Sequence, residues 1–282
     1  MILFKLIRLE WIKTFRKLRT YIGFIAITVL LPLMYIGLKF DQGRFLTNNP
    51  AFKMLEQNFF LVGNLLNGFF VSHLAMFFLM VHIPILIALV AGDQVAGEAT
   101  AGTLRMILIR PPSRLKIITA KAAISLIYTT MLVLFLAIFS LTMGVAMFGT
   151  GDLLVMEKGL LILSQKQAIV SFLIAYPLAI LAMSVIAALA FLLSVLVENA
   201  IGPIIGTMAI VIVSVIISET PISLFEKIKP FLFTTYTKVW QKAFFNPCPV
   251  GEIASSVLYL FLFLALFLGV AFFIFNRKDV LS

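Results

Sequence analysis

Charged residues are absent from six long stretches of the chain, which are otherwise dominated by apolar side chains. An apolar run of about 18 or more residues is long enough to cross a bilayer as a helix. The second stretch begins with several Asn and Gly residues, so its helix is expected at about 69–91. Six spans place both termini on one side of the membrane. The stretches are 20–38, 57–92, 122–151, 167–197, 199–218 and 253–276.

Composition supports a membrane protein. Apolar residues make up 62% of the 282 residues and charged residues 12%, against roughly 45–50% and about 25% in soluble domains. These values exclude a soluble globular protein and a disordered chain. We expect an all-α integral membrane protein with a single transmembrane domain over 1–282.

The charges predict which side each loop occupies. With cytoplasmic termini, the inner segments hold 13 of the 22 Lys and Arg residues and five of the 12 acids. Their net charge is +8, whereas the outer loops carry +2 of the total of +10. Basic residues in short loops stay on the cytoplasmic side. Both termini are therefore expected in the cytoplasm, in a multi-pass protein of the cell (cytoplasmic or inner) membrane, and this positive charge requires no nucleic-acid partner.

Residues 1–19 are expected to form an amphipathic helix on the membrane interface. Their apolar residues recur at helical spacing and most of their basic residues lie on the other arc, as in helices that lie along a bilayer surface. Some apolar residues interrupt the polar arc, which allows contact with protein as well. A general positive-inside anchor and a specific mechanical role explain the segment equally.

The longest outer connection is 219–252, which contains four prolines and short apolar pieces. The pieces 230–233 and 243–245 are too short to cross the bilayer. They can dip into it as re-entrant segments or cover a cavity.

Catalytic and metal-binding patterns are missing from the sequence. His73 and His82 lie nine residues apart in one predicted span and point to opposite helix faces, and Cys248 is the only cysteine. Gly144 and Gly149 have P-loop spacing, but Thr150 stands where that motif requires lysine. We expect no enzyme activity, metal or cofactor in this chain. His82, just before Pro84, is a candidate functional residue, with a packing role as the alternative.

The six spans also lack the buried charges that ion-coupled transporters use along their pathways. This pattern argues against a transporter powered by its own proton or ion gradient. Sodium binding through backbone carbonyls remains open.

The cytoplasmic segment 93–121 combines small residues, a glutamate and hydrophobic residues. Residues 95–106 are expected to form a short helix, with Gly102 as a weak point. Pro111 and Pro112 end any helix, and Ser113 can cap the next one. A short helix between two spans is suited to pass force from a cytoplasmic partner, although an ordinary basic connector explains the same residues.

This segment resembles the signature of permease subunits of type-2 ABC transporters, a family dominated by exporters. The matching residues are Glu98, Gly102, Thr103, Leu104, Leu108, Pro111 or Pro112, Ser113, Arg114 and Lys121. The ending 275–280 is similar to the family's closing motif, and the basic start is similar to its elbow helix. The paired prolines depart from the family's single one. The resemblance covers the whole chain in layout and about thirty positions in detail.

The resemblance implies a separate ATPase subunit, which binds ATP and Mg²⁺, and a second copy of this permease or a homologous one. It places Glu98 on a coupling helix, paired with a basic residue of the ATPase. The residues implied in coupling are Glu98, Gly102, Thr103, Leu104, Arg105, Pro111, Ser113, Arg114 and Glu198. The second and fifth spans would line a path between the two permeases, with Phe77, Phe78, His82, Met208 and Ser214 as candidate lining residues.

We therefore expect an ABC permease that exports a substrate with ATP hydrolysed by its partner. The first alternative is a secondary transporter or channel that acts alone. The second is a membrane anchor that recruits an ATPase without transporting anything.

Overall fold

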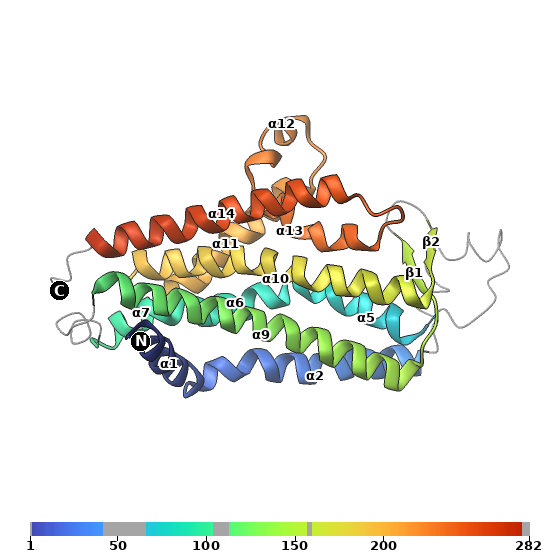
Figure 1. Ribbon diagram of the computed structural model, residues 1–282, viewed down its shortest axis with the longest axis horizontal. Coiled ribbons are helices and arrows are strands. Elements are labelled where there is room, and N and C mark those ends of the chain that lie inside the picture. The colour runs from blue at the N-terminus through green and yellow to red at the C-terminus, as the bar shows by residue number, and fades with distance from the viewer. Residues whose placement is uncertain (1, 42–65, 104–112, 157–159, 278–282) are drawn as a thin grey trace.

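The computed structural model describes residues 2–41, 66–103, 113–156 and 160–277 and is dominated by long helices (Figure 1). The long helices are α2 (Leu18–Phe40), α9 (Arg114–Phe148), α10 (Gln165–Leu196), α11 (Ile201–Glu219) and α14 (Val250–Arg277). The shorter ones are α1 (Ile2–Phe15), α5 (Gly68–Met76), η1 (Phe77–Leu79), α6 (His82–Ala91), α7 (Asp93–Thr100), α12 (Ser223–Glu226), η2 (Lys229–Phe231), α13 (Thr234–Thr237) and η3 (Lys238–Phe244). Two strands, β1 (Leu153–Met156) and β2 (Leu160–Leu163), complete the described elements.

Several helices are long and apolar enough to cross a membrane. Within the described residues, α2, α9, α10, α11 and α14 each meet that requirement, and the bent pair formed by Gly68–Leu79 and His82–Ala91 adds a sixth span if it is counted as one. The structure thus supports a helical membrane protein with five or six spans. Figure 1 shows α1, α7 and the end of α14 at one end of the bundle, and the two strands at the other.

Helix α10 forms the centre of the bundle. Within its most apolar window, 72% of the residues are buried, against 11% in the corresponding window of α14. Alanines make up much of its buried surface, including Ala175, Ala179, Ala182 and Ala187. Small side chains let neighbouring backbones approach closely in a membrane bundle. Helices α6, α9, α11 and α14 therefore pack around α10.

The second span is broken, which corrects the expectation of one helix over about 69–91. Its two parts bend by 47° around Met80 and Val81. Pro84 explains where the second part begins, because its ring would clash with the carbonyl of Met80 in a continuous helix. Helix α6 begins at His82, which places Pro84 in the first turn, where a missing N–H group leaves no hydrogen bond unmade.

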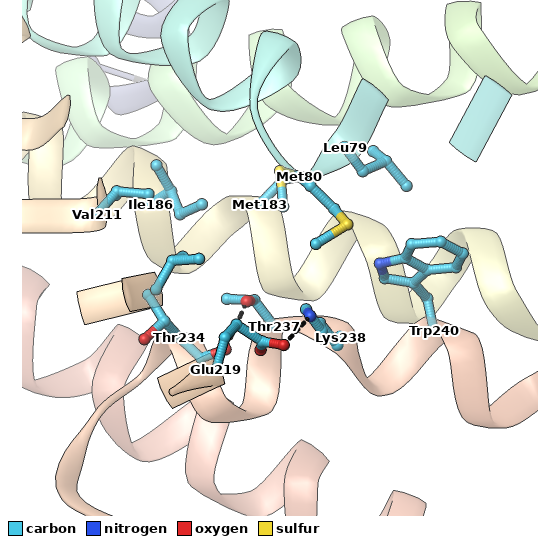
Figure 2. Close-up of a pocket in the computed structure, with 11 residues that line it drawn as sticks. Leu79, Met80, Met183, Ile186, Val211, Glu219, Thr234, Thr237, Lys238 and Trp240 are labelled. Carbon is cyan, nitrogen blue, oxygen red and sulfur yellow. Dashed lines mark hydrogen bonds and ion pairs between the residues drawn. The ribbon is translucent and has the colours of Figure 1, made fainter. Parts of the chain in front are cut away.

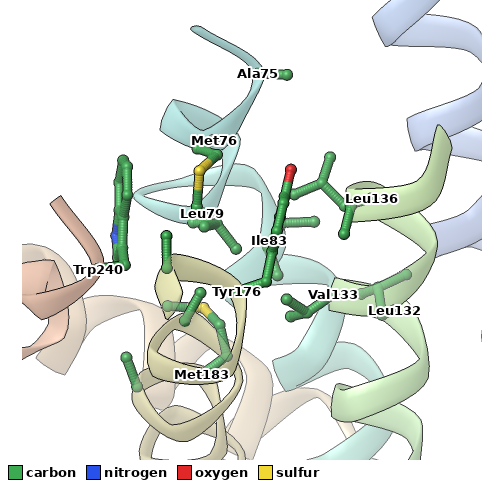
Figure 3. Close-up of a cluster of buried hydrophobic side chains, with 14 of the residues drawn as sticks. Ala75, Met76, Leu79, Ile83, Leu132, Val133, Leu136, Tyr176, Met183 and Trp240 are labelled. Carbon is green, nitrogen blue, oxygen red and sulfur yellow. The ribbon is translucent and has the colours of Figure 1, made fainter. Parts of the chain in front are cut away.

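Buried side chains on both sides of this break hold it in the core (Figure 3). Met76 and Leu79 lie before the break and Ile83 after it, and all three are fully buried. They belong to the same cluster as Leu136 of α9 and Met183 of α10. The bend is therefore packed from two helices.

A group of buried hydroxyls joins four helices near Ser140 of α9. The Ser140 carbonyl accepts hydrogen bonds from Tyr35 Oη of α2 at 3.1 Å and from Ser72 Oγ of α5 at 2.9 Å. The Ser140 hydroxyl is 3.1 Å from Tyr176 Oη of α10. Such bonds replace the water that these groups would otherwise contact, and they fix the register between helices.

A β-hairpin lies between α9 and α10, which departs from the all-α expectation. Strands β1 and β2 pair antiparallel, with Leu153 opposite Leu163. A four-residue apolar run does not distinguish a strand from a helix by its pattern. The pairing is supported from α5, because Asn67 Nδ2 donates to the Asp152 carbonyl at 2.7 Å.

The segment between α11 and α14 folds against the bundle. Figure 1 shows α12 and α13 beside its middle rather than beyond its end. Trp240 and Phe244 of η3 are buried, and η3 packs on α10. Phe231 is instead 79% exposed. Packing of η3 on α10 leaves both expectations for 219–252, re-entrant insertion into lipid and covering of a cavity, as predictions.

Cysteine labelling tests whether α10 crosses the membrane. In a Cys248→Ser background, Lys166→Cys and Glu198→Cys place single thiols at exposed positions near opposite ends of α10. Its 32 residues span about 48 Å at 1.5 Å per residue, more than the hydrocarbon core of about 30 Å. A membrane-impermeant maleimide should label position 166 in intact cells and position 198 only after permeabilisation. Equal labelling of both thiols in intact cells would contradict the spanning assignment.

Candidate functional site

The region with the most polar chemistry lies around α7, at the end of the bundle that holds α1. Helix α7 follows α6 after a single residue, Gly92. Its first four residues are buried. The hydroxyl of Ser194 in α10 accepts hydrogen bonds from the backbone N–H groups of Val95 and Ala96, at 3.0 and 2.9 Å. These bonds satisfy N–H groups that a helix start leaves without partners and attach α7 to the central helix.

Helix α9 reaches this region because it is longer than a span requires. Its 35 residues extend about 52 Å, more than a hydrocarbon core of about 30 Å, and its first turns lie beside α1 and α7. This extension carries Lys121, whose side chain is 1% exposed. The ammonium group of Lys121 lies among α1, α7 and α9.

Lys121 and three other side chains form the Lys121 cluster, defined as Glu10, Lys13, Glu98 and Lys121. Lys121 Nζ lies 2.9 Å from Glu10 Oε2 and 2.8 Å from Glu98 Oε2, and it donates to the Gln94 carbonyl at 3.0 Å. An ammonium group has three N–H bonds, and two of them donate to Glu10 Oε2 and to the Gln94 carbonyl. The Glu98 contact is an ion pair by distance and lacks hydrogen-bond geometry.

Lys13 closes the cluster from α1. Lys13 Nζ lies 2.8 Å from Glu10 Oε1 and 3.1 Å from Glu98 Oε1. Each carboxylate therefore places one oxygen on each ammonium group, and the four charges sum to zero. This neutrality matters because isolated buried charges are costly.

Charge pairing shifts the pKa values of the two cluster members on α1. Burial alone raises the pKa of Glu10, but the neighbouring Lys121 and Lys13 outweigh it and hold that pKa below its ordinary value of 4.5. Burial likewise lowers the pKa of Lys13, but its contacts with Glu10 and Glu98 outweigh that effect and raise it above 10.5. Both shifts favour the charged forms.

A second group, the Asp93 cluster, consists of Asp93, Lys17 and Arg19. Lys17 Nζ lies 2.6 Å from Asp93 Oδ2, and Arg19 Nη1 contacts Asp93 Oδ1. The Asp93 side chain is 4% exposed, whereas the two cations are about 40% exposed. Asp93 packs over Gly97, where a Cβ atom would clash with its carboxylate. The turn between α1 and α2 is thereby fixed to the start of α7.

The far end of α7 meets the connection between α10 and α11. Thr100 Oγ1 lies 2.8 Å from the Glu198 carbonyl and accepts a hydrogen bond from Ala200 N at 3.2 Å. Glu198 and Asn199 are exposed, as are Thr100, Ala101 and Gly102. Two segments a hundred residues apart thus share one exposed surface.

The residues that the sequence predicts to couple to an ATPase lie in different environments in the structure. Glu98 lies inside the Lys121 cluster, with its side chain 12% exposed, so internal cations already occupy its carboxylate. Gly102 and Thr103 follow α7, Ser113 and Arg114 begin the third span, and Glu198 is exposed. Ser113 does not cap α9 with its side chain, contrary to expectation. Leu104, Arg105 and Pro111, with Leu108 and Pro112, lie outside the described residues.

The candidate path residues differ in their exposure. Phe77 and His82 are exposed, Phe78 packs on His82 with ring centroids 4.6 Å apart, and Ser214 of α11 is buried. Met208 is half-buried. A path between two permeases that uses these residues stays a prediction.

A small cavity does lie beside the break in the second span (Figure 2). Its volume is about 20 Å³. Leu79, Met80, Val211 and Trp240 contribute to its wall, together with Glu219 and Lys238, whose charged groups are 2.7 Å apart. None of the candidate path residues lines it. In the described part of the chain, no group of three or more His, Cys, Asp or Glu side chains could hold a metal ion.

Sequence reasoning missed most of the ion-pair partners. Glu10, Asp93 and Lys121 were visible as charges at the edges of apolar stretches, and Lys121 was part of the signature. Glu10 is the only acid in the basic segment 1–19, and this was the one signal in the sequence that pointed to a buried ion pair. Its partner stands 111 positions away, so spacing along the sequence could not identify it.

Replacing Lys121 should destabilise the fold strongly. Lys121→Gln leaves two buried carboxylates with Lys13 as their remaining partner in the cluster, and removing one member of a buried pair costs about 3–5 kcal/mol. We expect a clearly lower thermal unfolding midpoint in detergent. Lys116→Gln, at an exposed position of the same helix, is the matched control and should change stability little. Equal effects of both variants would contradict the assigned role of the cluster.

Acid should weaken the Lys121 cluster through Glu10. A carboxylate whose pKa is lowered on folding stabilises the protein above its unfolded pKa, and this contribution is lost as the pH falls through the folded value. The stability difference between wild type and Glu10→Gln should therefore be constant from about pH 6 to 8 and shrink as the pH falls below 4.5. Thermal unfolding of both proteins at a series of pH values measures this stability difference. A difference that is unchanged into strong acid would show that Glu10 does not act through its charge.

Comparison with known proteins relates most of this chain to one family. The family model described as "Protein of unknown function (DUF2705)" matches residues 24–281. The match includes α7 and Lys121 and begins after α1. No curated protein matches the chain. The chain therefore belongs to the DUF2705 family.

Proposed function

We propose that this protein is the membrane-spanning permease subunit of an ABC transporter of the type-2 family. It moves a substrate, by export, with ATP hydrolysed by a separate ATPase subunit on the cytoplasmic side. The observation that carries the proposal is the attachment of α7, a short helix outside the spans that is bonded to several of them. The working unit contains two ATPases and two permeases, the second being another copy or a homologue.

Attachment makes α7 a suitable receiver of force. One residue links it to α6, Ser194 bonds it to α10, and Glu98 pairs it with Lys121 of α9. A flexible connector would absorb a displacement, because its backbone dihedrals could change. Displacement of α7 must instead move three spans together or break buried polar contacts. Nucleotide-driven motion of an ATPase could in this way alter access to a path in the membrane.

The exposed surface beside α7 supplies a place for the ATPase. Thr100, Ala101 and Gly102 lie there next to Glu198 and Asn199. We propose that this surface meets the ATPase, while Glu98 holds α7 in register from within. An exposed carboxylate such as that of Glu198 influences orientation and specificity more reliably than net affinity.

The uncharged spans favour an external energy source. Residues 122–151 and 167–197 contain no Asp, Glu, Lys or Arg, whereas ion-driven transporters place such groups along their pathways. The exposed positions of Phe77 and His82 suit a path formed with a second permease. The mostly apolar residues predicted to line this path favour a hydrophobic or lipid-like substrate.

Purification with the native partner tests this function. We would isolate the full chain from its own cell in a mild detergent and identify the accompanying proteins by mass spectrometry. An ATPase with a Walker motif should accompany the wild type. The variant Ala101→Arg with Glu198→Lys should recover roughly tenfold less of it, since it adds bulk and reverses charge on the proposed contact surface.

The control is Lys166→Glu, a charge reversal at the opposite end of α10, which should retain the ATPase. Equal retention by all variants would exclude this surface as the contact. Absence of an ATPase from the wild type would favour a transporter or channel that acts alone. An ATPase that binds without any nucleotide-dependent transport would favour a membrane anchor.

A further inference from the structure

A groove with a volume of about 1000 Å³ opens between α1, α7 and α9. Its wall includes both ion-pair clusters, and five basic and three acidic side chains line it in all. Apolar side chains, among them Leu6, Leu9 and Ile117, also contribute. The groove therefore combines an excess of positive charge with apolar surface.

The positive charge is concentrated at one edge. The Lys121 cluster is neutral, because two ammonium groups face two carboxylates. The Asp93 cluster has two cations for one carboxylate, which leaves a charge of +1. Arg16 is exposed and forms no side-chain ion pair within the described residues. The surplus of two charges thus lies at Arg16, Lys17 and Arg19, in the turn between α1 and α2.

The carboxylates lie deeper than the cations. Asp93 is almost fully buried, whereas Lys17 and Arg19 keep about 40% of their side-chain surface exposed. A ligand that enters the groove therefore meets cations at the rim. Asp93 also orders two of these cations, so an anion that binds them pays less conformational entropy than it would on free side chains.

The surroundings place this edge at the depth of lipid headgroups. Trp11 and Tyr21 lie on either side of the turn and are partly or largely exposed, and such residues are enriched at membrane interfaces. Leu18, the first residue of α2, is 87% exposed, as expected for a side chain that reaches lipid. On α1, Leu9 is 55% exposed within the arc that carries charge. One amphipathic molecule could cover both the basic edge of the groove and its apolar side chains.

We propose that this groove binds an anionic phospholipid from the leaflet in which α1 lies. Its phosphate occupies the edge formed by Arg16, Lys17 and Arg19, and its glycerol and upper acyl chains cover Leu6 and Leu9. This site joins the elbow helix, the start of α7 and the surrounding bilayer. The proposal does not depend on an ATPase partner.

Lipid binding to the purified full chain in neutral detergent tests the site. Native mass spectrometry would compare dioleoyl phosphatidylglycerol, which is anionic, with dioleoyl phosphatidylcholine, which is not. We expect roughly tenfold tighter binding of the anionic lipid, because each basic residue near a charged lipid surface contributes about 1 kcal/mol. Equal binding of the two lipids would overturn the proposal.

The matched variants remove two charges each. Arg16→Gln with Arg19→Gln should weaken phosphatidylglycerol binding roughly tenfold and leave Lys17 to pair with Asp93. Lys5→Gln with Arg8→Gln removes two exposed charges of α1 outside the groove and should preserve binding within about twofold, since neutral detergent provides no charged surface. An equal loss in both double variants would indicate diffuse attraction and overturn the site.

Two further measurements keep the test decisive. Arg16→Gln alone leaves both Asp93 ion pairs intact and should still reduce binding roughly threefold, so a folding defect in the double variant would not obscure the result. Size-exclusion chromatography and thermal unfolding monitor the fold. Displacement of phosphatidylglycerol by millimolar inorganic phosphate would indicate a site for soluble phosphate and overturn the lipid assignment.

Discussion

The buried ammonium group of Lys121 imposes a constraint that organises the whole end of the bundle around it. A lysine that is 1% exposed must have its charge balanced, because an unpaired buried charge is far more costly than a paired one. No side chain of α9 itself provides this balance. Glu10 of α1, Glu98 of α7 and the Gln94 carbonyl do so, and they can do so only when α1 and α7 lie against α9. The position of two helices outside the spans thus follows from one charge.

This arrangement joins α1, α7 and α9 through buried ion pairs at one end of the bundle. Helix α1 is held by the Lys121 cluster and the turn after it by the Asp93 cluster, while α7 is held by both clusters and by Ser194 of α10. The same contacts leave one face of α7 exposed beside Glu198 and leave cations at the rim of a groove beside α1. The proposed ATPase contact on α7 and the proposed lipid contact beside α1 therefore lie on neighbouring surfaces. The ion pairs between α1 and α7 connect these two surfaces.

The packing of the long apolar helices against one another does not depend on buried charges. In lipid there is little hydrophobic driving force between helices, so close packing and hydrogen bonds between helices decide the arrangement. Small residues make α10 the central helix, and the hydroxyls around Ser140 fix its neighbours in register. The broken second span fits this scheme because Met76, Leu79 and Ile83 remain buried across the bend. Neighbouring helices therefore pack against one side of this irregular segment, while Phe77, Val81 and His82 are exposed.

The sequence by itself determined the membrane class of the protein, the approximate positions of its long helices and the amphipathic character of residues 1–19, because composition and apolar run length are local properties. It also indicated 93–121 as the segment with unusual chemistry. Only the tertiary structure decided that Glu98 faces Lys13 and Lys121 inside the chain, that Glu10 is the distant partner of Lys121, and that the second span bends near Met80. The apolar runs 153–156 and 160–163 likewise became a hairpin through pairing with each other. Ion pairs and strand pairing join residues that are distant along the chain or ambiguous in pattern, so their partners are set by how the helices pack and not by local spacing.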